Sequence, residues 1–152
     1  MEGNMIKKIL TITVIAIILT GCSKASVMET DTYYGNIGGV EMIVELQHSD
    51  DILIKQTSEN SLNYIDNGFT KVSAEETVNK YKSLYNIEGV TYKAEVTQNS
   101  IKEKIIVDFE KADIDDLKRV GLILIKSKDR KVYYVSYKAT VQNLERIGLK
   151  EL

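Results

Sequence analysis

The chain of 152 residues contains no proline and no tryptophan, and it has one cysteine and one histidine. A single cysteine excludes an intramolecular disulfide and any zinc site built on several thiolates. A single histidine is poor material for a Ser-His-Asp triad. The 20 basic and 22 acidic side chains give a net charge of −2. No basic block stands out, which argues against nucleic acid as a partner. Motifs of the GxSxG, P-loop, dinucleotide-binding and CxxC types are also missing.

The one cysteine ends a pattern typical of a bacterial lipoprotein signal peptide. Basic residues at 7–8 precede an apolar run over 9–19, and Leu19, Thr20 and Gly21 lead directly to Cys22. As a helix this run reaches only about 17 Å, roughly half of a ~30 Å hydrocarbon core, which favours a signal peptide over a transmembrane helix. The Cys22 thiol is the predicted acceptor of a diacylglyceryl group. The alternative is a buried free cysteine beside a short hydrophobic helix.

These features divide the chain. Residues 1–21 are the predicted signal peptide, residues 22–30 the lipidated cysteine and a short polar tether, and residues 31–152 a single domain. Two acyl chains anchor a protein stably, so we predict a lipid-anchored protein at the extracytoplasmic face of the cell membrane. A tether of this length reaches about 25–30 Å, which keeps the domain close to the bilayer. Met5 is a better signal-peptide start than Met1, because Glu2 adds an acid upstream.

Period-two alternation predicts the strands of the first half. Residues 39–48 form a half-buried strand, the stretch 49–51 a turn, and residues 52–57 the returning arm. Residues 33–37 form an earlier strand that ends at Gly38-Gly39. The inward face of the 39–48 strand is predicted to carry Val40, Met42, Val44, Leu46 and His48.

A helix and a second hairpin follow. Ser73 is the predicted N-cap of the helix, with Glu76 completing a capping box, and Asn86 ends it before Gly89. The hairpin joins strands 90–96 and 101–109 through Asn99-Ser100. That loop pairs Glu95 with Lys104, Tyr92 with Val107, Ala94 with Ile105 and Val96 with Glu103. Only Glu103 then falls on the apolar side, near the tip where the sheet can fray.

The last third predicts two helices and one more hairpin. Asp113 caps a short helix that Gly121 ends. Strands 122–125 and 132–135 form the hairpin, and Ser136 caps a final helix that Gly148 ends. Sequential hairpins with helices between them indicate an α+β fold. We predict a two-layer sandwich in which a mainly antiparallel sheet carries two or three helices on one face.

The chain resembles the YehR family of small bacterial lipoproteins, a domain of unknown function. The resemblance implies a compact two-layer fold and a membrane anchor, and it brings no established reaction and no catalytic residues. It rests on the cysteine motif, on Gly38-Gly39-Val40-Glu41, on Asp51-Ile52-Leu53-Ile54-Lys55-Gln56-Thr57, on Gly89-Val90-Thr91-Tyr92 and on Val107-Asp108-Phe109-Glu110-Lys111-Ala112-Asp113.

Few residues are candidates for chemistry. Asp108, Lys111 and Asp113 form the best candidate polar site, because they follow a buried strand. His48 is interpreted as a polar residue at a strand end, since a zinc site would need further histidines or cysteines. The acids at 113–116 are interpreted as stabilising a helix start. In the pairs Tyr33-Tyr34 and Tyr133-Tyr134, one ring of each is expected in the core, because neighbours on a strand point to opposite faces.

We therefore expect no enzyme, no cofactor and no metal. The first hypothesis is a non-enzymatic module that binds an envelope protein or component, with the diacylglyceryl group on Cys22 holding it to the membrane. The alternative is a lipoprotein that binds a small ligand or metal and assists a transporter. An envelope hydrolase ranks last, because no activated nucleophile is evident. A concave pocket lined by tyrosines and carboxylates favours the second hypothesis, and an exposed apolar patch the first.

Overall fold

A computed structural model describes residues 27–123 and 134–152 of the chain. One sheet of seven strands has the order β4-β5-β3-β2-β1-β7, with β6 also paired to β3. All of its pairings are antiparallel. The described strands are β1 (Glu29–Ile37), β2 (Val40–Ser49), β3 (Ile52–Asn63), β4 (Val90–Val96), β5 (Ser100–Asp108), β6 (Val135–Ser136) and β7 (Lys150–Glu151).

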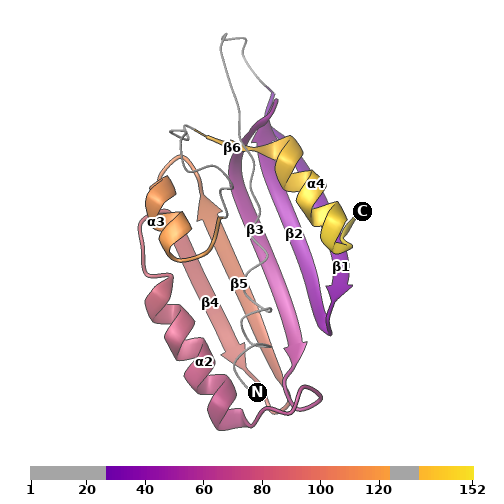
Figure 1. Cartoon of the computed structure of the whole chain (residues 1–152), viewed down its shortest axis with the longest axis vertical. Helices are drawn as coiled ribbons and strands as arrows, with labels where there is room; N and C mark the ends of the chain where they lie inside the picture. Colours follow the sequence, from indigo (N-terminus) through magenta and orange to yellow (C-terminus); the bar gives the residue numbers. More distant parts are fainter. Residues whose placement is uncertain (1–26, 124–133) are drawn as a thin grey trace.

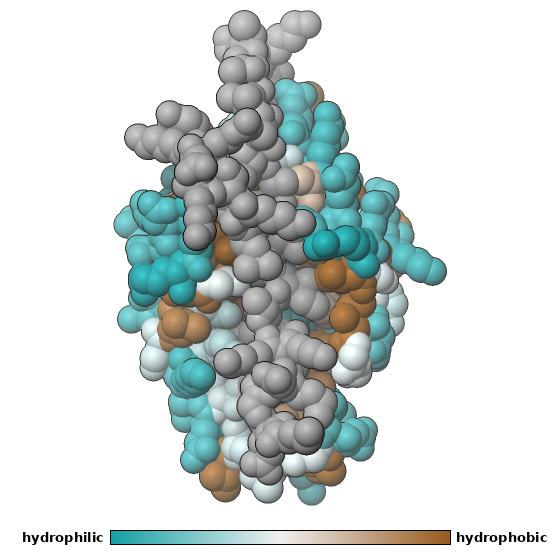
Figure 2. Space-filling view, in the orientation of Figure 1, coloured by the Kyte–Doolittle hydropathy of each residue, from teal (hydrophilic) through white to brown (hydrophobic). Residues whose placement is uncertain are grey.

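The described helices are α2 (Lys71–Leu84), α3 (Ile114–Arg119) and α4 (Tyr137–Ile147). Figure 1 shows them on one face of the sheet, with α4 over β1 and β2 and with α2 and α3 beside β4. Figure 2 shows the same face in space-filling form, where hydrophilic residues cover most of the margin and hydrophobic residues gather in small groups. The predicted α+β fold, with an antiparallel sheet and helices on one face, is confirmed.

The β1–β2 hairpin follows the predicted alternation. Gly38 and Gly39 form its turn with φ angles of 60° and 89°, the pair of positive values that a tight hairpin turn demands. Inward side chains of β2 are buried as predicted, among them Met42, Val44 and Leu46. They belong to a core that also includes Tyr33 and, from the helices, Tyr81, Tyr85, Leu117 and Leu144.

Strand β3 is longer than predicted and contains a bulge. It runs from Ile52 to Asn63, six residues beyond the predicted end at Thr57. Its pairing with β2 shifts between Gln47 and His48. The shift leaves Ile54 unpaired in the ladder with β2, and Leu53 and Gln56 are both buried although they are three positions apart. Because a bulge inserts one extra residue, it changes which residues of a strand face inward.

Helix α2 begins earlier than predicted. Thr70 is the N-cap, and its side chain accepts a hydrogen bond from the backbone of Ser73, which completes the capping box from the N3 position. The predicted cap at Ser73 is therefore wrong by three residues, because the Ser73 hydroxyl occupies the N3 position of the box and accepts from the Thr70 backbone N–H at 3.0 Å. Leu84 is the last helical residue and Tyr85 the C-cap, so the helix also ends before the predicted Asn86.

The β4–β5 hairpin keeps its predicted faces but not its predicted partners. Val96 pairs with Ile101, and the backbone N–H of Thr97 bonds to Ser100 at 2.8 Å. The loop is therefore Gln98-Asn99, one residue earlier than predicted. The Thr97 hydroxyl fixes this choice, since it accepts from the Ser100 N–H at 3.0 Å. Each cross-strand partner moves by two positions, an even step that leaves every side chain on its predicted face.

The corrected partners place Tyr92 opposite Ile105, Ala94 opposite Glu103 and Glu95 opposite Lys102. Glu103 therefore lies further from the tip than predicted, and it is 5% exposed. The prediction that Glu103 lies near the tip, where the sheet can fray, is therefore wrong.

The C-terminal third confirms both predicted caps. Asp113 accepts from the backbones of Asp115 and Asp116 at the start of α3, and Ser136 caps α4. Of the predicted last hairpin, residues 124–133 lie outside the described residues. Leu122 and Ile123 are buried but form no strand. Val135 pairs instead with Leu53 of β3, because the turn between β2 and β3 holds the start of α4 through Asp51, which accepts from the Ser136 hydroxyl at 2.9 Å.

Candidate functional site

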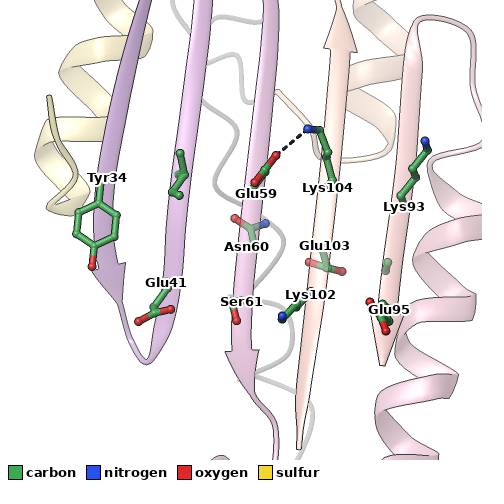
Figure 3. Close-up of a pocket in the computed structure, with 12 residues that line it drawn as sticks. Tyr34, Glu41, Glu59, Asn60, Ser61, Lys93, Glu95, Lys102, Glu103 and Lys104 are labelled. Carbon is green, nitrogen blue, oxygen red and sulfur yellow. Dashed lines mark hydrogen bonds and ion pairs between the residues drawn. The ribbon is translucent and has the colours of Figure 1, made fainter. Parts of the chain in front are cut away.

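The open face of the sheet, opposite the helices, contains a hollow of about 460 Å³. Figure 3 shows the side chains around it, which come from β1, β2, β3, β5 and β4. Charges of both signs line the hollow, with Glu41, Glu59 and Glu95 against Lys93, Lys102 and Lys104. An apolar pair lies beside them, since Tyr34 and Ile43 are directly opposite each other and are 45% and 43% exposed.

Cross-strand neighbours set the charge pattern of this hollow. Lys104 Nζ lies 2.7 Å from Glu59 Oε1 across the β3–β5 boundary. Lys93 is directly opposite Lys104, an arrangement of like charges that is unfavourable in a sheet. The glutamate beside Lys104 offsets part of this repulsion. The hollow therefore offers paired charges around an apolar spot.

The inner face of the same strands is polar at its centre, where a hydrophobic surface is expected. Gln56, Ser58 and Asn60 are successive inward residues of β3, and all are buried. Asn60 is directly opposite Glu103 of β5. Gln56 Nε2 donates to Ser58 Oγ at 3.0 Å. We call Gln56, Ser58, Asn60 and Glu103 the inner polar row.

Burial governs the chemistry of Glu103. Desolvation raises the pKa of its carboxyl, while hydrogen bonds from Tyr92 and Asn60 oppose that rise. The Tyr92 hydroxyl donates to Glu103 Oε1 at 2.5 Å. Burial and the neighbouring carboxyl also raise the pKa of Tyr92, so this phenol stays a hydrogen-bond donor.

Aromatic rings from α2 lie next to this pair. The rings of Tyr81 and Tyr85 are stacked with their centroids 5.6 Å apart. Tyr85 in turn meets Tyr92 edge-on at 5.5 Å. Desolvation raises the pKa of the Tyr85 hydroxyl as well. The inner polar row is thus bordered by three neutral phenol rings.

His48 is held in a separate network at the other end of the sheet. Its Nε2 lies 3.0 Å from Asp31 Oδ2, and its Nδ1 lies 3.0 Å from the Asp50 carbonyl. The ring stacks on Tyr137 at 3.6 Å, whose hydroxyl donates to Asp31 at 2.5 Å. His48 is at a strand end as predicted, but it is buried and joins β1, β2 and α4. Both ring nitrogens are occupied.

The predicted polar site separates into two local arrangements. Lys111 Nζ lies 2.6 Å from Asp108 Oδ2, and this hydrogen bond is the main reason why the pKa of Asp108 lies below its usual range. Asp113 instead caps α3 through two backbone N–H groups. The role of these three residues as a binding site stays a prediction.

Of the first tyrosine pair, Tyr33 is buried and Tyr34 exposed, as predicted. Tyr133 lies outside the described residues, as do Leu19, Thr20, Gly21 and Cys22. Among residues 27–123 and 134–152, no three His, Cys, Asp or Glu side chains gather in a way that would hold a metal ion.

Sequence reasoning missed the inner polar row because the predicted strand stopped at Thr57. The signal was present: polar residues at every second position, Gln56, Ser58 and Asn60, followed by Leu62. If the strand is continued through these residues, the alternation places their polar side chains on the face that the helices cover.

These features define a small α+β domain with one antiparallel sheet, an open outer face and a polar centre on its inner face. Residues 29–150 match the family described as "Protein of unknown function (DUF1307)", and the chain belongs to this family. The resemblance to YehR proteins is confirmed. The chain is 27% identical over 130 residues, 84% of each chain, to the "Uncharacterized lipoprotein YehR" of Escherichia coli.

Two further comparisons agree. The "Uncharacterized lipoprotein Lmo0207" of Listeria monocytogenes is 26% identical over 154 residues, 98% of each chain. The NMR structure of Escherichia coli YehR superimposes with a TM-score of 0.69 at 25% identity, covering 85% of this chain and 94% of that one. The relatives are named as lipoproteins whose activity is uncharacterised.

Proposed function

We propose that this protein is a lipid-anchored binding module on the extracytoplasmic face of the cell membrane. The Leu19-Thr20-Gly21-Cys22 motif supports the anchor, and so do the relatives that are named lipoproteins. In the part of the chain that the structure describes, no helix has the length and apolar character needed to span a bilayer. Lipid on Cys22 would hold the domain to the membrane.

The hollow on the open face carries the binding part of this proposal. Its apolar pair, Tyr34 and Ile43, is surrounded by lysines and glutamates. This layout suits an envelope protein whose contacting segment presents an apolar side chain among charges of both signs. A non-enzymatic role is supported by His48, because both of its ring nitrogens are already occupied. Nothing in the hollow supplies an alternative activated nucleophile.

Site-specific photocrosslinking in living cells tests the proposal. A photoreactive phenylalanine derivative replaces Ile43 in the hollow or, as the control, Val72 on α2, which is also exposed. We expect one discrete protein adduct from position 43 and none from position 72. Lys93→Glu should reduce the yield at position 43, because it reverses a charge that lines the hollow. Equal adduct patterns at both positions, or none at position 43, would contradict this function.

The anchor has its own test. Cys22→Ser should abolish incorporation of radiolabelled palmitate and should leave an unprocessed or released protein. Persistent labelling in that variant would show that lipid is attached elsewhere or that the signal is misread.

A second candidate is the binding of a small ligand, and a specific observation favours it. The inner polar row holds buried polar atoms without partners, which is unusual in a domain core. The other parts of that hypothesis, a metal and a transporter, have no comparable support within the described residues.

A further inference from the structure

A straight row of side chains crosses the open face of the sheet, with one residue from each of β1, β2, β3, β5 and β4. Each residue is directly opposite the next, in the order Tyr34, Ile43, Glu59, Lys104 and Lys93. We call these residues the outer row, and all of them line the hollow. Figure 3 shows its two ends, with Tyr34 on β1 and Lys93 on β4. The row therefore has an apolar end on β1 and β2 and a basic end on β5 and β4.

Lys93 is the charge that this row leaves unpaired. It is directly opposite Lys104, whose own ion pair is with Glu59 at 2.7 Å. Within residues 27–123 and 134–152, Lys93 has no ion-pair partner. Like charges directly opposite each other destabilise a sheet. An anionic group brought to the basic end would remove a cost that the fold itself leaves in place.

The other charges of the hollow limit what this anionic group can belong to. Glu95 is directly opposite Lys102, so that pair is already complementary. Glu41 is directly opposite Ser61, which has no charge, and it adds a negative charge near the apolar end. A polyanion or an anionic lipid surface lying over the whole hollow would be repelled by this glutamate. A single acidic side chain at Lys93 would avoid that repulsion.

One short segment can reach both ends of the outer row. Neighbouring strands lie about 4.8 Å apart, so the centres of the apolar and basic ends are separated by roughly three strand spacings, or about 14 Å. An extended chain covers that distance in about four residues. At the apolar end, Tyr34 and Ile43 are 45% and 43% exposed, which leaves apolar surface for a partner's side chain to cover.

We propose that an envelope protein docks on the open face with an aspartate or glutamate side chain between Lys93 and Lys104. An apolar side chain of the same segment packs on Tyr34 and Ile43. This inference rests on the binding role proposed above and adds the chemistry of the partner's contacting segment. The carboxylate accepts hydrogen bonds from both ammonium groups and relieves their repulsion. Glu41 sets the direction of the segment, because an acid at the apolar end would be repelled.

Zero-length crosslinking in living cells tests the acidic contact. A water-soluble carbodiimide joins a lysine amine to a carboxylate in contact with it, without a spacer. We expect mass spectrometry to find Lys93 joined to an aspartate or glutamate of the same protein that the photoreactive residue at position 43 captures. Lys104 and Glu59, at 2.7 Å, provide the internal control, because their crosslink needs no partner.

Two changes of Lys93 separate its charge from its reactivity. Lys93→Arg keeps the charge but has no amine for this crosslink, so the adduct yield at position 43 should stay the same while the Lys93 link disappears. Lys93→Glu should lower the yield at position 43 about fivefold, because it sets a like charge against the partner's acid. Lys82→Glu, a charge reversal at an exposed residue of α2, is the matched control and should leave that yield unchanged.

The inference is overturned if Lys104 and Glu59 become joined but Lys93 is joined to no carboxylate of the partner. It is also wrong if Lys93→Glu lowers the yield no more than Lys82→Glu does, or if Lys93 is joined to a lipid or a cell-wall polymer. In each of these cases, a discrete protein adduct at position 43 would leave the proposed binding role intact. If position 43 gives no adduct, both proposals are wrong.

Discussion

Tyr92 and Glu103 are diagonal neighbours on the inner face of β4 and β5, and they share the 2.5 Å hydrogen bond from the phenol to the carboxyl. This bond satisfies one carboxyl oxygen and leaves the other buried without a partner. Glu103 is therefore a costly residue for the fold, because a buried carboxylate is destabilising unless it is fully paired. A residue with that cost is a natural candidate for function.

Glu103 should make the stability of the protein dependent on pH. Burial raises its pKa in the folded state, while the unfolded chain has the ordinary value of about 4.3. The folded protein therefore binds this proton more tightly. Its contribution to the free energy of unfolding is fully present below the unfolded pKa and is lost as the pH rises through the folded pKa.

Urea unfolding of the natural protein and of Glu103→Gln across this pH range measures the effect. The gap in midpoint between the two should widen in favour of the variant as the pH rises, since glutamine has no proton to lose. Glu95→Gln, on the exposed face, should follow the natural protein. A constant gap between Glu103→Gln and the natural protein at every pH would contradict a raised pKa.

The corrected hairpin register predicts which charges are coupled. Glu59 and Lys104 lie 2.7 Å apart but are half exposed, so a double-mutant cycle to alanine should give a coupling of only about 0.2–1 kcal/mol. The cycle for Glu95 and Lys104, the pair expected from the sequence alone, should give less. A larger coupling for Glu95 and Lys104 would favour the register predicted from the sequence over the one in the structure.

Helix α2 should depend on Thr70 rather than on Glu76. Thr70→Ala removes the side chain that accepts from the Ser73 backbone, and loss of an N-cap typically costs about 0.5–2 kcal/mol. Glu76→Ala, in the same exposed region, removes no cap and should leave the unfolding midpoint almost unchanged. Equal effects of the two changes on chemical unfolding would argue against the cap at Thr70.

Gly89 and Gly121 offer a matched pair of substitutions. Both have positive φ, 76° and 77°, but a Cβ at Gly89 would lie 2.5 Å from the Ala112 backbone nitrogen, while one at Gly121 meets nothing within 4 Å. Gly121→Ala should cost only the left-handed conformation, about 1–2 kcal/mol. Gly89→Ala must also push the β5–α3 connection away.

Thermal unfolding separates the two glycine variants. We expect a clearly lower melting temperature for Gly89→Ala than for Gly121→Ala, or failure of the first to fold. Similar melting temperatures would mean that the segment around Ala112 moves aside at little cost.

The parts of the fold that the sequence predicts correctly are those marked by local patterns. Alternation identifies β2, and Asp113 and Ser136 identify the starts of α3 and α4, because each of these signals acts over a few residues. The hairpin loop at Gln98-Asn99 depends on the Thr97 hydroxyl, and the cap of α2 depends on Thr70 rather than on a nearby Ser-Glu pair. Such choices between adjacent polar residues are decided by small local energies.

The candidate site depends on long-range pairing, which local patterns do not report. Asn60 and Glu103 are far apart in the chain and meet only because β3 pairs with β5. The bulge near Ile54 decides that Gln56 faces inward. His48 and Tyr137 likewise meet only in the folded protein. Sequence alone places each residue on a strand or helix, but it does not choose the partners.

The position of β1 determines how the domain carries mechanical load. It is the first described strand after the proposed anchor, and all nine of its residues pair with β2, while β7 pairs with its other edge. A pull from the membrane on Glu29 would act along the strand. The hydrogen bonds of the ladder would then be sheared together rather than opened one after another. A domain held by the proposed anchor would therefore resist extension when the proposed envelope partner moves away.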